Sequence, residues 1–252
     1  MQRYFVNALM SSPNDFEILN PDAHHIKRVM RMKINDEIIC SDGMGNDALC
    51  KIISIEDNSV RASVIERLTE TNEMPIEITI VQAIPKGDKF EWILQKGTEL
   101  GAHAFIPWQA ERSVSIWDDK KFLKKQQRFN KIAKEAAEQS HRSLVPTITE
   151  PVNEKELLEL AKDYDKVLFA YEEESRRTTH HSLADVFKTI KHKNRVLICI
   201  GPEGGFSKDE AETFIENGWD SVRLGPRILR TETAPLYLLA SISYHFEELE
   251  NS

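Results

Sequence analysis

Hydrophobic and polar residues alternate in short runs over the first part of the chain, with the two-residue period of strands that bury one face. The clearest runs lie at residues 37–40, 49–55 and 60–65. Asp42-Gly43 supplies hairpin turn chemistry between the first two runs, and a short helical pattern at 24–30 interrupts the strands. These patterns predict a small β-barrel domain over residues 1–72.

The pattern changes after the polar, aperiodic segment 69–75, which marks the expected domain boundary. Apolar strands then alternate with amphipathic helices over residues 73–252, which is typical of an α/β domain with a largely parallel sheet. Strands are predicted at 76–84, 104–106, 167–171, 195–200 and about 222–224, and helices at 88–100, 118–142, 154–161, 183–190, from 207 and from 233.

Three helix starts carry recognisable capping residues. Ser207 with Glu210, and Asn153 with Glu156, have the spacing of a capping box. Thr233 is a candidate cap for the last helix.

The composition is that of a globular protein, with 252 residues, 40% hydrophobic and 29% charged. The first residues lack the basic and apolar regions of a signal peptide, and no apolar run is long enough to span a membrane. Cys40, Cys50 and Cys199 form no Cys-x-x-Cys pair, so we expect reduced, buried thiols of a cytoplasmic protein. The pairs His24-His25 and His180-His181 have no acidic or cysteine partner at ligand spacing, so no metal site is predicted.

The predicted helix at 118–142 is basic although the whole chain has a net charge of −8. Between Asp119 and Arg142 the sequence has eight cationic side chains and three carboxylates. The cations are Lys120, Lys121, Lys124, Lys125, Arg128, Lys131, Lys134 and Arg142. A solvated helix face is the ordinary interpretation, but the contrast with the acidic chain favours contact with phosphates.

Two strand ends near the C-terminus break into glycine turns, at 201–206 and 225–230. Parallel strands bring their carboxyl ends to one edge of the sheet, where α/β proteins form ligand crevices. Polar side chains gather in these turns, namely Glu203, Arg227, Arg230, Thr231 and Glu232. An ordinary strand-to-helix loop and a surface salt bridge are the alternatives to a small-molecule site.

Several common enzyme classes are not indicated. The chain has neither a Gly-x-Gly-x-x-Gly turn after the first strand of the α/β region nor a P-loop motif, so dinucleotide and P-loop chemistry are not expected. No serine, histidine and acid arrangement is identifiable. Binding of an anion by the free N–H groups of the helix that starts after Gly205 stays an open hypothesis.

The two glycine turns closely resemble those of the RsmE family, the bacterial small-subunit ribosomal-RNA methyltransferases of the SPOUT superfamily. The similar segments are Ile200-Gly-Pro-Glu-Gly-Gly-Phe-Ser207 and Leu224-Gly-Pro-Arg-Ile-Leu-Arg-Thr-Glu-Thr-Ala234, with further similarity at 86–101, 106–107, 132–140, 142, 145–146, 3–5, 25, 29–31 and 42–43. Departures are small: Asn35-Asp36 replaces a common Gly-Asp, and Phe129-Asn130 replaces Arg-Trp.

The resemblance implies a PUA-like N-terminal barrel that helps hold RNA and a C-terminal trefoil-knotted α/β methyltransferase domain. It further implies a homodimer, S-adenosylmethionine as cofactor and, as substrate, 16S rRNA within the 30S subunit. The implied product is 3-methyluridine, formed by methylation of the ring imide nitrogen of one uridine.

The resemblance also implies positions for the site. The residues expected to bind the cofactor are Phe169, Ala170, Tyr171, Ile200, Gly201, Pro202, Gly204, Gly205, Leu224, Gly225, Ile228, Leu229, Thr231 and Ala234. We expect Arg230 to stabilise negative charge on the uracil, and Glu203 or Glu232 to receive its proton. The candidates for contact with rRNA phosphates are Arg3, Arg28, Arg31, Lys124, Lys125, Arg128 and Arg142.

Three rival hypotheses stay open. A knotted methyltransferase could act on a ribose 2′-hydroxyl or on tRNA, and the modified nucleoside would identify it. A non-catalytic ribosome-assembly factor would bind RNA without needing S-adenosylmethionine. A general α/β enzyme would hold a phosphate at residues 201–205.

Overall fold

The computed structural model describes residues 1–6, 14–69, 72–171 and 182–249. The chain divides into two compact units. The first comprises Met1–Glu73 and Lys134–Val145, and the second comprises Met74–Ala133 and Pro146–Ser252. The sequence pattern had placed residues 134–145 in the second domain, whereas their contacts group them with the first.

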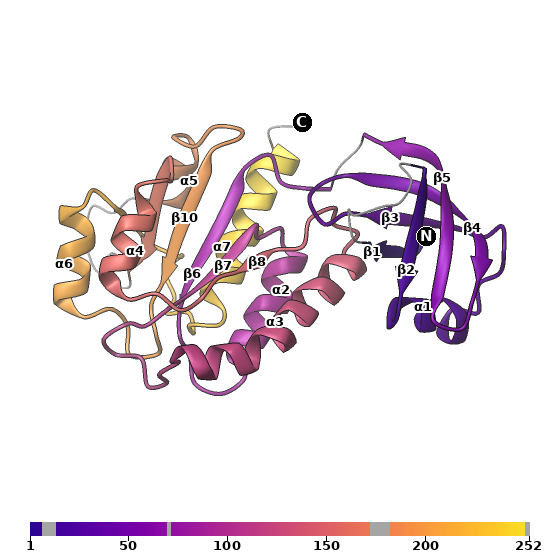
Figure 1. Cartoon of the computed structure of the whole chain (residues 1–252). Coiled ribbons are helices and arrows are strands. Elements are labelled where there is room, and N and C mark those ends of the chain that lie inside the picture. The colour runs from indigo at the N-terminus through magenta and orange to yellow at the C-terminus, as the bar shows by residue number, and fades with distance from the viewer. Residues whose placement is uncertain (7–13, 70–71, 172–181, 250–252) are drawn as a thin grey trace. The chain divides into compact units, whose positions relative to one another are not determined.

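The first unit contains a five-stranded sheet (Figure 1), with the strand order β1-β3-β4-β5-β2. Its strands are β1 (Arg3–Phe5), β2 (Asp15–Leu19), β3 (Glu37–Ser41), β4 (Asp47–Ile55) and β5 (Ser59–Leu68). All neighbours are antiparallel except β1 and β3. The helical piece is α1 (Asp22–His24) followed by the π-helical η1 (His25–Val29). The three predicted strands and the predicted helical piece are therefore confirmed.

Local chemistry explains the tight connections of this sheet. In the β3–β4 turn the Asp42 carboxylate accepts hydrogen bonds from the backbone N–H groups of Met44 and Asn46, at 2.8 and 3.1 Å. Gly43 has a φ of 74°, a conformation that glycine adopts without steric cost. Asn35 also has a positive φ, 78°, which asparagine tolerates better than most residues.

The second unit is built on a six-stranded sheet in which every pairing is parallel, in the order β11-β9-β10-β6-β7-β8. Its strands are β6 (Glu77–Ala83), β7 (Ala104–Trp108), β8 (Thr147–Ile148), β9 (Lys166–Ala170), β10 (Arg195–Ile200) and β11 (Asp220–Val222). The helices are α2 (Lys89–Glu99), α3 (Asp119–Gln139), α4 (Glu154–Ala161), α5 (Leu183–Phe187), α6 (Lys208–Glu216) and α7 (Ala234–Ser243), which continues as the π-helical η3 (Tyr244–Leu249). The predicted α/β architecture with a parallel sheet is confirmed.

Helices cover both faces of this sheet. On one face, side chains of α4 and α6 pack with those of the central strands around Trp108, Phe206 and Phe214. On the other face α2 approaches the sheet closely, because a Cβ at Gly97 would lie 2.8 Å from the ring of Phe105 and 3.6 Å from Leu239 of α7. The middle strands β6 and β10 are therefore buried on both faces, as expected for a parallel sheet.

The predicted helix caps are confirmed in two of three cases. Ser207 and Asn153 each accept a hydrogen bond from the N–H group three residues on, and Glu210 and Glu156 bond back to the cap residues. Thr233 does occupy the cap position of α7, but its side chain makes no capping hydrogen bond. The capping prediction for Thr233 was wrong because its backbone is already helical, with φ −88° and ψ −34°.

Candidate functional site

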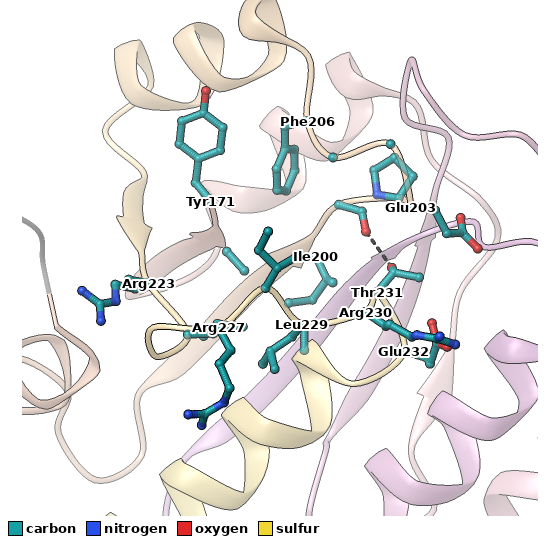
Figure 2. A pocket seen from close by; sticks show the side chains of 18 of the residues that line it. Tyr171, Ile200, Glu203, Phe206, Arg223, Arg227, Leu229, Arg230, Thr231 and Glu232 are labelled. Carbon is teal, nitrogen blue, oxygen red and sulfur yellow. Dashed lines mark hydrogen bonds between the residues drawn. The ribbon is translucent and has the colours of Figure 1, made fainter. Parts of the chain in front are cut away.

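A cavity of about 540 Å³ lies at the carboxyl ends of β9, β10 and β11 (Figure 2). Ala170, Ile200 and Val222, which end these three strands, all line it. The glycine turn 201–206 and the segment 223–232 form much of its wall. The two turns singled out by the sequence pattern thus meet at one edge of the sheet.

Of the predicted catalytic and cofactor residues, every one except Phe169 lines this cavity. The lining set includes Glu203, Arg230, Glu232, Ala170, Tyr171, Ile200, Gly201, Pro202, Gly204, Gly205, Leu224, Gly225, Ile228, Leu229, Thr231 and Ala234. Residues from three strand ends and two loops therefore converge on one space.

Phe169 corrects one assignment. Its side chain is fully buried and packs edge-on against Phe206 and Phe214, at ring-centroid distances of 5.6 and 5.5 Å. Alternate residues of a strand point to opposite faces, and Phe169 belongs to the hydrophobic core beside Trp108. Phe169 supports the cavity wall without forming part of it.

Two glycines of the first turn leave little room for a side chain. A Cβ at Gly201 would lie 3.0 Å from the Phe206 ring, and one at Gly204 would lie 3.3 Å from the Cβ of Arg112. Gly225 has a φ of 75°, where other residues are strained. Bare backbone therefore faces the cavity where a ligand could approach it closely.

The Thr231 hydroxyl ties the two turns to the centre of the sheet. It donates a hydrogen bond to the carbonyl of Gly201 at 2.7 Å (Figure 2) and accepts one from Gln82 Nε2 at 2.9 Å. Gln82 belongs to the central strand β6 and is fully buried. This chain of hydrogen bonds fixes the separation of the two turns.

Lys89, which the sequence reading did not select, joins the two candidate acids. Its Nζ lies 2.9 Å from Glu203 Oε1 and 3.1 Å from Glu232 Oε2. Partial burial favours the neutral form of Glu203, but hydrogen bonds from Lys89 and from the backbone N–H of Lys86 outweigh it. The pKa of Glu203 therefore lies below its ordinary value, and the hydrogen bond to Glu203 raises the pKa of Lys89.

Arg112 is a second cavity residue that sequence reasoning missed. Its Nη1 donates to the carbonyls of Gly204 and Phe206, at 3.2 and 3.0 Å. Both Lys89 and Arg112 follow the carboxyl end of a parallel strand, β6 or β7. A search for charged residues after every predicted strand of the sheet, instead of after two of them, would have found both.

The predicted RNA-binding residues fall into two groups. Arg28, Arg31, Lys124 and Arg128 have exposed side chains, although Arg128 also pairs with Glu91 of α2 at 2.6 Å. Lys125 is half-buried, with its Nζ 5.5 Å from the centre of the Trp117 ring. These five residues are available to a polyanion.

Arg3 and Arg142 are buried and not available to a polyanion, so their assignment to RNA phosphates was wrong. Arg3 Nη1 lies 2.5 Å from Asp47 Oδ2, and both side chains are at most 5% exposed. The Arg142 guanidinium is 3% exposed and binds the carboxylate of Glu73, whose Oε1 also accepts the N–H of Ser143 at 2.9 Å. Buried guanidinium groups in such pairs cannot reach a phosphate.

Metal-ligand and membrane features complete the description. Within the described ranges, no three His, Cys, Asp or Glu side chains gather as they would around a metal ion. His25 Nδ1 forms a 3.0 Å hydrogen bond with the Tyr4 hydroxyl, while His180 and His181 lie outside those ranges.

A membrane-crossing helix is not found in the part of the chain that the structure describes. Cys40, Cys50 and Cys199 are free and buried, as expected.

Comparisons with known proteins identify the family. A family model described as an RNA methyltransferase domain matches residues 72–243, and one described as an RNA methyltransferase PUA domain matches residues 18–65. The chain is 46% identical to the ribosomal RNA small subunit methyltransferase E of Bacillus subtilis over 252 residues, covering 99% of this chain and 98% of that protein. It is 34% identical to the enzyme of the same name from Mesomycoplasma hyopneumoniae over 239 residues, covering 95% and 97%.

A solved structure agrees with these sequence matches. The crystal structure of a ribosomal RNA small subunit methyltransferase E from Neisseria gonorrhoeae bound to S-adenosyl methionine superposes with a TM-score of 0.83 at 29% identity, covering 98% of each chain. The matched region extends over nearly the full length of the chain. The protein belongs to the ribosomal RNA small subunit methyltransferase E family.

Proposed function

We propose that this protein transfers a methyl group from S-adenosylmethionine to the ring imide nitrogen of one uridine in 16S rRNA, giving 3-methyluridine. The observation that carries the proposal is the cavity at the carboxyl ends of β9, β10 and β11, lined by both glycine turns and by seven charged residues. Family membership supports the reaction class and the RNA substrate.

The cavity suits S-adenosylmethionine. Its volume of about 540 Å³ is within the usual range for small-molecule sites. Leu224, Ile228 and Leu229 offer apolar walls for the adenine, and the bare backbone at Gly201 and Gly225 offers polar groups. When bound, the sulfonium supplies an activated methyl group. The relative from Neisseria gonorrhoeae was solved with this molecule bound.

Arg230 has the charge needed on the uridine side. The imide proton is weakly acidic, so its loss requires stabilisation of the resulting anion. Arg230 lines the cavity with an exposed side chain that is permanently cationic. We assign it to the uracil oxygen on which negative charge develops, because a positioned cation acts most strongly on charge that appears in the transition state.

Glu232 is the better proton acceptor of the two candidate acids. Glu203 accepts hydrogen bonds from Lys89 Nζ and from the Lys86 N–H, which stabilise its ionised form and make it a weaker base. Glu232 is less exposed, at 17% of its side chain, and faces the same lysine. Glu203 then serves mainly to hold Lys89 in place.

The finer points of architecture belong to the same proposal. We take the second unit to be a trefoil knot that includes the segments 201–206 and 223–232, which the Thr231–Gly201 hydrogen bond joins. We take the protein to be a homodimer, since Ile228, Tyr237 and Tyr244 expose 73, 37 and 59% of their surface on and beside α7. Light scattering would test the dimer.

The RNA contacts are assigned to both units. Arg28 and Arg31 of the PUA-matched unit and the basic helix α3 are the proposed phosphate contacts, and the 30S subunit is the proposed setting. Three free, buried cysteines agree with a cytoplasmic place of action.

Methyl transfer to naked 16S rRNA and to 30S particles, both from a strain that lacks the enzyme, tests the proposal. Mass spectrometry of the nucleosides should reveal 3-methyluridine at one mapped position. A 2′-O-methylated nucleoside, or transfer to tRNA only, would instead support the rival activities. Absence of S-adenosylmethionine binding by calorimetry would indicate a non-catalytic assembly factor.

A further inference from the structure

Trp92 is the exposed tryptophan of the chain. All four tryptophans lie within the described residues, and Trp108, Trp117 and Trp219 are at most 9% exposed. Trp92 exposes 45% of its surface. Among the described residues, no aromatic ring stacks on its indole and no cation lies over it. A large, flat apolar surface is therefore open to solvent on α2.

The position of Trp92 links this surface to the cavity. Lys89, the first residue of α2, lines the cavity and contacts Glu203 and Glu232. Trp92 follows three residues later, so the two side chains share a helix face and their Cα atoms are about 4.5 Å apart along the axis. Helical side chains lean toward the N-terminus, which directs the indole back over the turn that carries Lys89.

Trp92 lies on a helix that packs against the basic helix α3, since the rings of Phe90 on α2 and Phe129 on α3 have centroids 5.1 Å apart. The neighbouring Glu91 is paired with Arg128 of α3, whose side chain is 69% exposed. Over residues 119–133, α3 carries six cations and one carboxylate. An exposed aromatic surface on a helix that packs against the cations of α3 matches single-stranded RNA, whose phosphates need cations and whose bases stack on aromatic rings.

We propose that Trp92 is a stacking platform for the base next to the target uridine. The inference rests on the proposed methylation of a uridine base. An enzyme that modifies the ring nitrogen of a base must take that base out of its stack, and the neighbouring base then loses a stacking partner. The indole of Trp92 takes the place of the lost stacking partner, about one helical turn from Lys89, which lines the cavity. Arg128 holds the adjoining phosphate.

Two variants test the role of the indole. Trp92→Ala removes the ring, whereas Trp92→Phe keeps a stacking surface. With unmethylated 16S rRNA as substrate, the KM for RNA should rise about tenfold in Trp92→Ala and change little in Trp92→Phe. The KM for S-adenosylmethionine and the melting temperature should stay unchanged, since the side chain is exposed and lies outside the cavity wall.

Ile215→Ala provides a matched control, because Ile215 on α6 is 46% exposed and does not line the cavity. This variant should behave like the unmodified protein. Intrinsic fluorescence supplies a direct readout: a short single-stranded RNA oligonucleotide should quench the emission, and Trp92→Phe should abolish most of that quenching.

The outcomes separate this inference from the proposed function. If the unmodified protein forms 3-methyluridine and Trp92→Ala has an unchanged KM for RNA, the stacking role is wrong and the function stands. If the unmodified protein does not methylate uridine, the proposed function fails. In that case, loss of quenching in Trp92→Phe would still support a base-stacking site, and retained quenching would overturn it.

Discussion

In the first unit Arg3 and Arg142 are buried against carboxylates, whereas in the second unit Arg227 and Arg230 expose their side chains at the cavity. A buried guanidinium needs a carboxylate to offset lost hydration, and that pair then serves the structure. An exposed guanidinium at a cavity keeps its charge available for a ligand. The same residue type thus has opposite uses, and burial decides between them.

The largest expected effect comes from breaking a buried pair. Arg3→Met should lower the free energy of unfolding by about 3–5 kcal/mol, because it leaves Asp47 buried without its cation. Urea unfolding measures this change. Methyl transfer per folded molecule should stay unchanged.

The double variant Arg3→Met, Asp47→Asn sharpens this test. It should recover part of the lost stability, because the uncompensated charge is gone and Ser143 Oγ can still bond to position 47. A normal unfolding curve with weakened RNA binding in Arg3→Met would show that Arg3 does act on phosphate.

The next effect concerns the exposed arginine at the cavity. Arg230→Ala should lower kcat by about a hundredfold, since it removes the cation proposed for the developing charge, while the affinity for S-adenosylmethionine stays nearly unchanged. Arg195→Ala is the matched control, because Arg195 is exposed at the opposite end of β10. Unchanged turnover in Arg230→Ala would refute its role.

A smaller effect is expected on the basic helix. Lys124→Glu with Lys125→Glu should weaken RNA binding several-fold and reduce the slope of log affinity against log salt by about 1.4. Filter binding over a salt series measures both quantities. If the slope does not change, α3 presents an ordinary solvated face.

The smallest expected effect is a displaced pH profile. Lys89 lowers the pKa of Glu203, so Lys89→Met should raise that pKa toward its ordinary value. Glu203 then becomes protonated at higher pH, and NMR titration of the Glu203 side-chain carboxyl measures the change. A titration midpoint that moves to lower pH in Lys89→Met would contradict the proposed ion pairing.

Much of the fold follows from local pattern. Strands with alternating residues, such as β5, and helices with a capping box, such as α6, were predicted because their signals lie within a few neighbouring residues. β1, β2 and β8 were not predicted, since they exist through pairing with strands that are distant in the chain.

The site was predictable to a similar degree. Both glycine turns were found because they follow strand ends, and the resemblance supplied the ligand. The burial of Arg3 and Arg142 depends on partners 44 and 69 residues away, which a sequence pattern does not reveal. Lys89 was missed for the same reason, since Glu203 lies 114 residues further along the chain.

The Thr231 hydroxyl has a consequence for how ligand binding would be detected. It connects two turns 30 residues apart to a buried glutamine 149 residues away on the central strand. A ligand that holds both turns therefore stabilises the whole second unit, by about 2.7 kcal/mol at a hundred times its dissociation constant. Backbone amides deep in β6 and β10 would then exchange with deuterium more slowly, although the ligand does not touch them.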